Sequence, residues 1–173
     1  MKYFKIFLTI LFLFNIGTYS LASEIYFIDM KKILNHSKAG KGAQDYLTKS
    51  FKENQKKFSN QQEELKKEEA DLLGKKNVLS KEDYTKKADS LRKKVIDYQS
   101  ARRAAVDKIA KQRKEAREDL LNQINPILET YTKENNITLI LDKKNLIMGD
   151  SDLDITNTII EKLNTKLPSI KIN

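Results

Sequence analysis

The acidic residues near the C-terminal end of the chain have the spacing of calcium ligands. Asp150, Asp152 and Asp154 alternate, and Glu161 stands at position twelve counted from Asp150, as do the carboxylates of an EF-hand loop. That loop requires glycine at its sixth position for a sharp turn, and Ile155 stands there instead. The sequence therefore favours a helix-capping role for these carboxylates over calcium binding.

The remaining residues with reactive side chains do not form a catalytic set. His36 is the only histidine and stands between Asn35 and Ser37, without an evident nucleophile or second ligand beside it. We interpret it as a solvated residue at a helix start. The sequence contains no Gly-rich phosphate loop, nucleophile elbow or metal-ligand motif. We therefore expect neither an enzyme nor a bound cofactor.

Seven basic residues stand close together within residues 102–117 of the chain's polar middle. They could attract acidic polypeptides or anionic lipid head groups by long-range electrostatics. They could equally form a solvated helical face that pairs with Glu115, Glu118 and Asp119. The residues concerned are Arg102, Arg103, Lys108, Lys111, Arg113, Lys114 and Arg117.

The first 22 residues are typical of a secretory signal peptide. Lys2 and Lys5 precede an apolar run from Ile6 to about Ile16, and the segment ends in a small-x-small pattern at Ala22. A membrane anchor is the alternative, but the run is shorter than the roughly 20 residues that a span needs. After removal of the signal peptide, the mature chain would carry a formal charge of +7, from 31 basic and 24 acidic residues. The absence of cysteine fits an oxidising compartment. Nucleic acid is a poor candidate partner outside the cytoplasm.

Two short apolar segments must be covered by other parts of the fold. They are residues Glu24 to Met30 and Ile137 to Asp142, and each carries apolar side chains on both faces, as a covered strand does. Two such strands with open edges are too small to be stable alone, so we expect them to associate with other copies of the chain. The predicted interface residues are Ile25, Phe27, Ile28, Ile137, Leu139, Ile140 and Leu141.

The segment between these strands has the composition of long helices, because it is rich in charged residues and poor in Gly and Pro. Gly74 suits a helix C-cap, and Ser80 with Asp83 predicts the start of a second helix. Apolar positions that face the partner helix, here called the seam, recur every seven residues at Phe51, Phe58, Leu65 and Leu72. In the return helix two polar residues, Arg102 and Gln112, interrupt the seam, whose positions are Tyr84, Ala88, Leu91, Val95, Tyr98, Arg102, Ala105, Ile109, Gln112 and Ala116.

The chain is therefore predicted to be an α+β protein with a long antiparallel helical hairpin on a small β body. Residues 38–135 form the coiled-coil arm, with its tip near 74–80, and residues 23–37 and 136–173 form the β-rich body through which copies of the chain would associate. Pro126 predicts a kink or a fresh helix start. Leu146 to Met148 could add a third strand. A last helix should begin near Asp154, as its N-cap, and end at Pro168.

With EIYFIDM at the start of the predicted mature chain and ITLILDKKNLIMGDSDLDITNTIIEKLN near its end, the sequence resembles the Skp/OmpH family of periplasmic chaperones. The resemblance covers residues 23–167. It implies a homotrimer whose strands assemble into a central barrel and whose hairpins enclose a cavity. That cavity would hold unfolded outer-membrane proteins without ATP, and anionic lipid or lipopolysaccharide surfaces are further partners to consider. The alternative is a structural coiled-coil spacer of the cell envelope.

Overall fold

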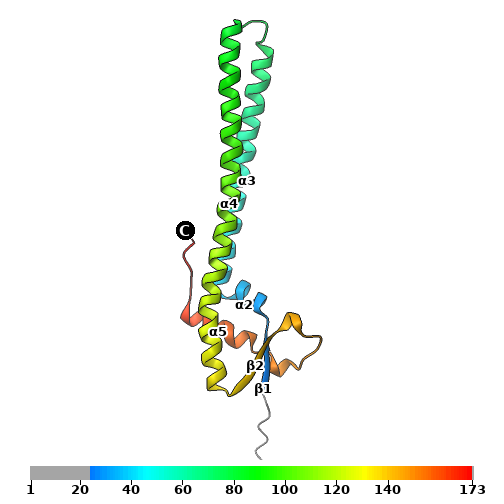
Figure 1. Cartoon of the computed structure of the whole chain (residues 1–173), viewed down its shortest axis with the longest axis vertical. Helices are drawn as coiled ribbons and strands as arrows, with labels where there is room; N and C mark the ends of the chain where they lie inside the picture. Colours follow the sequence, from blue (N-terminus) through cyan, green and yellow to red (C-terminus); the bar gives the residue numbers. More distant parts are fainter. Residues whose placement is uncertain (1–23, 173) are drawn as a thin grey trace, which may run out of the picture.

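The computed structural model describes residues 24–172, so the predicted signal peptide at residues 1–22 lies outside the described part. The fold is α+β: a two-stranded sheet and short helices form a small body, from which a long helical hairpin projects (Figure 1). In chain order the elements are β1 (Glu24–Ile28), α2 (Met30–His36), α3 (Lys38–Gly74), α4 (Lys81–Glu134), β2 (Ile137–Asp142), the 3-10 turns η1 (Lys143–Asn145) and η2 (Ser151–Leu153), and α5 (Thr156–Lys166).

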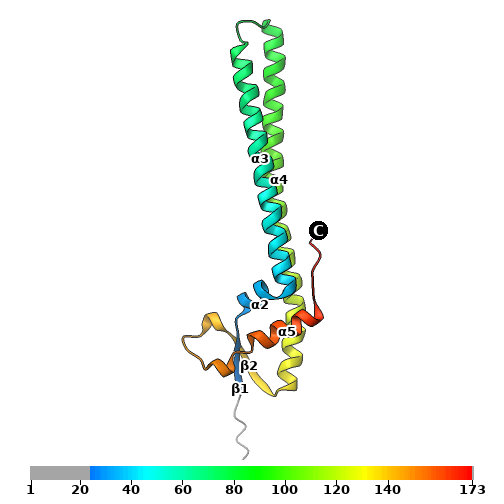
Figure 2. The ribbon, with the colours of Figure 1, turned by 180° about the vertical axis from the view of Figure 1, so that it is seen from behind.

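The hairpin consists of α3 and the longer α4, which run side by side over the length of α3 (Figures 1 and 2). Ser80 begins α4 as predicted: its Oγ accepts a hydrogen bond from the Asp83 amide at 3.1 Å and donates one to Asp83 Oδ2 at 2.6 Å. The predicted glycine cap is wrong. Gly74 is the last residue of α3, and the cap is Lys75 with φ −92°, a conformation open to any residue.

Helix α4 continues through Pro126, so the predicted fresh start is wrong. Proline has no amide hydrogen and leaves one carbonyl of the preceding turn without its helical partner. Ile124 and Ile127 on either side are buried in the core of the body. This packing holds the backbone helical where the local preference would interrupt it.

A short helix that the sequence analysis missed connects the sheet to the arm. Strand β1 ends at Ile28, two residues before the predicted end, because Asp29 accepts a hydrogen bond from the Lys32 amide at 2.8 Å and begins α2. Ser37 then ends α2 and caps α3, since its Oγ accepts from the Gly40 amide at 3.2 Å. The chain therefore turns from the body into the arm at Ser37.

Strands β1 and β2 are parallel neighbours, with Ile25 opposite Leu139 and Phe27 opposite Leu141. The predicted third strand at residues 146–148 is wrong. The position beside β1 belongs instead to Asp154, which forms an isolated bridge with Phe27, and the Ile155 amide donates to the Phe27 carbonyl at 3.1 Å. Residues 146–150 form a loop outside the sheet.

The core lies on one side of the sheet, between α2, the lower part of α4, and α5. It is built mainly from branched aliphatic residues, whose burial drives the packing of these helices. Within residues 24–172, none of the helices combines the length and the apolar character that a membrane span requires. The fully buried large apolar side chains of this core are Ile33, Ile124, Ile159 and Leu163.

Candidate functional site

The two faces of the sheet differ in how well this single chain covers them. Ile28 is buried in the core, and Tyr26 and Ile140 pack against it. On the other face, Ile25 and Leu139 stand opposite each other and are exposed. We call this second surface the open face of the sheet.

Part of that face is covered by the loop that follows β2. Phe27 is buried, the Lys143 ammonium lies 5.5 Å from the centre of its ring, and Gly149 is so close that a side chain there would meet the ring. Ile147 and Met148 at the outer end of this loop are fully exposed. The structure thus places the predicted interface residues in three environments: Phe27, Ile28 and Ile137 are buried, Ile140 and Leu141 are half-buried, and Ile25 and Leu139 are exposed.

The seam between α3 and α4 becomes less covered from the body toward the tip. Ile109 and Ala116 near the base are buried, and Phe58 packs edge-on against Tyr98 with ring centres 6.0 Å apart. Beyond Tyr98, the seam residues are only half-buried. The prediction of the return-helix seam is confirmed except at Arg102, which is exposed; in α3, Phe51 is exposed as well.

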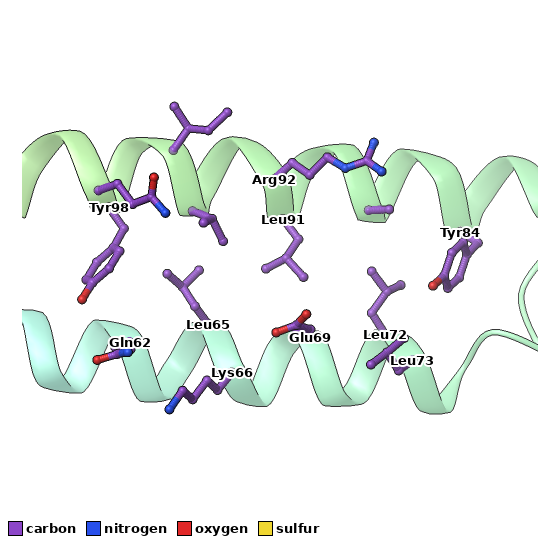
Figure 3. A pocket seen from close by; sticks show the side chains of 14 residues that line it. Gln62, Leu65, Lys66, Glu69, Leu72, Leu73, Tyr84, Leu91, Arg92 and Tyr98 are labelled. Atoms are coloured by element: carbon purple, nitrogen blue, oxygen red, sulfur yellow. The ribbon is translucent and has the colours of Figure 1, made fainter.

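One face of the arm is hollowed along this incompletely covered seam. A pocket of about 660 Å³ lies near the tip, and one of about 260 Å³ follows it toward the body. Gln62 and Tyr98 line both, so the two pockets adjoin along one face of the seam, and we call them together the arm furrow. Figure 3 shows Leu65, Leu72 and Leu91 directed between the helices at the floor of the tip pocket.

The rims of the arm furrow carry large apolar side chains that are more than half exposed. Phe51 (54%) and Leu73 (59%) come from α3, while Ile96 (63%) and Val106 (57%) come from α4. Isolated exposed apolar residues are ordinary on a protein surface. Four of them beside one apolar groove form a surface suited to contact with another molecule.

The opposite face of the arm is charged. Lys94 and Glu68 form a cross-helix ion pair at 2.6 Å there, beside a pocket of about 280 Å³ lined mostly by polar residues, including Asp71, Lys75 and Lys87. Nearer the body, the C-terminal tail lies along α4 (Figures 1 and 2), with Lys171 in a shared cleft beside the α4 lysines 108 and 111. The arm therefore has one apolar face and one polar face.

The predicted basic residues do not form a single patch. Arg102 lines the arm furrow, whereas Lys108 and Lys111 line the cleft beside the C-terminal tail. Arg117 lines a separate pocket of about 720 Å³ at the junction of arm and body. Arg103, Arg113 and Lys114 are exposed on α4. Two exposed lysines have acidic neighbours one turn along the helix, Lys111 with Glu115 at 3.7 Å and Lys114 with Glu118 at 3.8 Å.

The calcium-like carboxylates act as caps. Asp150 accepts from the Asp152 amide at 3.1 Å, and Asp154 accepts from both the amide and the hydroxyl of Thr156. The prediction of Asp154 as the N-cap of the last helix is wrong by one residue: α5 begins at Thr156 with Ile155 at the cap position, and Asp154 accepts from the Thr156 amide from the position before the cap. Residues 24–172 contain no group of three or more His, Cys, Asp and Glu side chains arranged to hold a metal ion. His36 is exposed at the end of α2, not at a helix start.

Asp154 also pairs with Lys143, whose Nζ lies 2.9 Å from Oδ2. Burial raises the pKa of the Asp154 carboxyl, but hydrogen bonds from Thr156 and Lys143 outweigh burial and hold that pKa below its usual value. The same hydrogen bond and the negative charge of Asp154 raise the pKa of Lys143. The pair fixes the loop after β2 to the start of α5.

Sequence reasoning missed three of the four rim residues, although a local signal was present. Leu73, Ile96 and Val106 each directly follow a predicted seam position. An apolar residue beside the seam in an otherwise polar helix widens the apolar stripe on one side only. That signal identifies the face on which the furrow lies.

The described residues thus form a long two-helix arm with an apolar furrow, rising from a small parallel sheet. The family described as "Outer membrane protein (OmpH-like)" matches residues 24–163, and the chain belongs to this family. No curated protein matches the sequence.

The fold is similar to the crystal structure of an OmpH-like protein from Caulobacter crescentus CB15, which is described as a candidate outer membrane chaperone. The TM-score is 0.79 over 91% of this chain and 94% of the other, at 15% sequence identity. The two chains therefore share the whole architecture, arm included.

Proposed function

We propose that the protein is an ATP-independent holdase of the periplasm that binds unfolded outer-membrane β-barrel proteins and prevents their aggregation. The observation that carries this proposal is the arm furrow, an apolar surface held away from the body on a projecting arm. Membership of the OmpH-like family supports the same class of function. A predicted signal peptide at residues 1–22 would deliver the chain to the compartment where such clients are unfolded.

We further propose that the working form is a homotrimer, with the client held in the cavity between three arms. The open face of the sheet supports association, because Ile25 and Leu139 are exposed on a sheet of only two strands. The exposed loop side chains Ile147 and Met148 extend the apolar surface of the same body. Sister copies would cover what a single copy leaves open.

The geometry suits temporary holding. An unfolded β-barrel protein exposes alternating apolar side chains and bare backbone groups, and it must be kept from pairing with itself without being bound too firmly to leave. Shallow contacts spread along a half-covered seam provide weak binding at many points. The basic residues of α4 would add long-range attraction to acidic clients or to anionic lipid or lipopolysaccharide surfaces.

Light scattering tests the proposal directly. An outer-membrane β-barrel protein diluted from denaturant should aggregate alone and stay dispersed in the presence of the chaperone at about one trimer per client. A structural spacer of the envelope, the alternative, would leave the scattering unchanged. Failure to suppress aggregation at any ratio rejects the holdase.

The effect of salt on client capture shows whether the basic residues attract the client or only form a solvated helical face. Replacing Arg102 and Arg103 by Gln should weaken client capture at low ionic strength and have little effect at high ionic strength, because salt screens exposed charges. Equal capture by the variant and the wild type under both conditions would assign these two residues to a solvated face.

A further inference from the structure

We propose that the arm furrow binds one extended polypeptide segment of about ten residues, the length of a single membrane-spanning β-strand, with its apolar side chains facing the seam. This inference rests on the proposed holdase function and specifies which face of the arm contacts the client and what part of the client it contacts.

The length of the furrow is the first argument. On α3 it extends from Phe51 to Leu73, which corresponds to roughly 33 Å at about 1.5 Å per residue. An extended chain advances about 3.3 Å per residue, so about ten residues fill this distance. A strand that crosses a membrane needs about 9–11 residues. The furrow and the repeating unit of the client therefore have the same length.

The chemistry of the furrow is the second argument. Its floor is apolar, with Leu65, Leu72 and Leu91 half-buried, and its walls end in the exposed rim residues. A strand of a β-barrel places apolar side chains on one face and polar ones on the other. Such a segment can rest its apolar face in the furrow and leave its polar face in water.

The charge beside the furrow is the third argument. Lys66, Arg92 and Arg102 line it together with the single acidic residue Glu69. The Arg92 guanidinium is 3.0 Å from Asp89 and is thereby partly neutralised. The remaining positive charge favours a segment whose polar positions are acidic over one whose polar positions are basic.

The chain's own C-terminal tail does not occupy this surface. Residues 167–172 run beside α4 next to the lysines 108 and 111, on the side of the seam away from Arg102 and Val106. Helical geometry separates Lys108 from Val106 by about 200° around the axis of α4. The furrow is thus open to an external segment while the tail is in place.

Photo-crosslinking on the intact exported protein tests the proposal. The probes are synthetic peptides of six, ten and fourteen residues that alternate leucine with aspartate, and a ten-residue peptide of the same composition in block order. A photoreactive residue at position 96 reports the furrow, and one at Ser90 reports the polar face. We expect crosslinks at position 96 and not at position 90, with affinity rising from six to ten residues and levelling off at fourteen.

A double variant, Leu73→Ser with Ile96→Ser, should weaken binding of the ten-residue peptide about fivefold. Both side chains are more than half exposed, so the fold should be unaffected. Val78→Ser is the matched control, because Val78 is an equally apolar, exposed residue outside the furrow. This control should bind the peptide as the wild type does.

Three outcomes overturn the inference: equal crosslinking at both positions, equal binding of the alternating and block peptides, or crosslinks at position 96 that join two copies of the chain without peptide. If aggregation of the client is still suppressed in these cases, the holdase function stands and only the assignment to the furrow fails. If suppression is absent as well, the proposed function itself is rejected.

Discussion

Replacing the exposed residues of the open face by lysine should abolish self-association of the protein. The double variant Ile25→Lys with Leu139→Lys changes two side chains that face each other across β1 and β2. They are 45% and 46% exposed in the single chain. Within the chain the substitutions therefore remove little packing, so circular dichroism should show unchanged helical content. Between chains they would place two charges in an apolar contact.

The magnitude follows from the exposed fractions. Complete burial of a Leu or Ile side chain contributes about 1.5–3 kcal/mol, so covering the exposed half contributes about 1 kcal/mol each. Two side chains in each copy of the proposed trimer give about 6 kcal/mol, which corresponds to a change on the order of 10⁴-fold in its association constant. Burying the lysine charges would add a further penalty. The variant should sediment as a monomer at micromolar concentration.

Analytical ultracentrifugation at matched concentrations provides the measurement. Val78→Lys is the control: Val78 is 83% exposed in the turn at the tip of the arm, far along α3 and α4 from the sheet. It should associate like the wild type. A variant at Ile25 and Leu139 that still forms trimers, or a wild-type protein that is itself monomeric, would show that the open face is not an interface between copies.

Three further substitutions test the local structure. Gly40→Ala should lower the free energy of unfolding in urea by several kcal/mol, because the added carbon would overlap the backbone carbonyl of Leu34. Gly42→Ala is the control: a carbon added there has no atom within 4 Å, so the substitution should be neutral or stabilise by up to about 1 kcal/mol. Asp154→Asn should lower stability at neutral pH by removing the ion pair with Lys143. Because the pKa of Asp154 is lowered and that of Lys143 is raised in the folded protein, the wild-type advantage in urea melts should be full between about pH 4 and pH 10 and shrink outside that window.

The sequence correctly predicted those element boundaries that are decided by residues close to them in the chain. Strand β2 has the predicted bounds, because a mainly apolar run begins after Asn136, whose φ of 52° turns the chain, and ends at Asp142, which caps the next turn. The start of α4 at Ser80 was equally clear. In both cases the residues that decide the boundary lie within four positions of it.

The errors occurred where a distant partner or a competing cap decides the structure. Met30 fits an apolar strand pattern, but the side chain of Asp29 begins a helix before it. Leu146 to Met148 is apolar enough for a strand, yet the position beside β1 is taken by Asp154, which the chain brings back after a loop. The arm furrow depends on how α3 and α4 pack, which the seam pattern alone does not specify.

Filling the seam should strengthen the arm and weaken client binding at the same time. Ala88 lines the tip pocket and Ala105 lines the pocket nearer the body, so leucine at both positions would occupy space that is now open. At half-buried positions, each added side chain should stabilise the arm by about 1 kcal/mol. The exchange of backbone amide hydrogens with solvent should therefore slow in α3 and α4.

The same double variant should suppress aggregation of a β-barrel client less well than the wild type, because the furrow that would receive the client's apolar face is filled. Small seam residues thus explain two properties by one cause: the helices pair weakly, and the apolar surface they fail to cover is available for binding. An arm that becomes more stable and still holds its clients as well as before would separate these properties and place client binding elsewhere on the molecule.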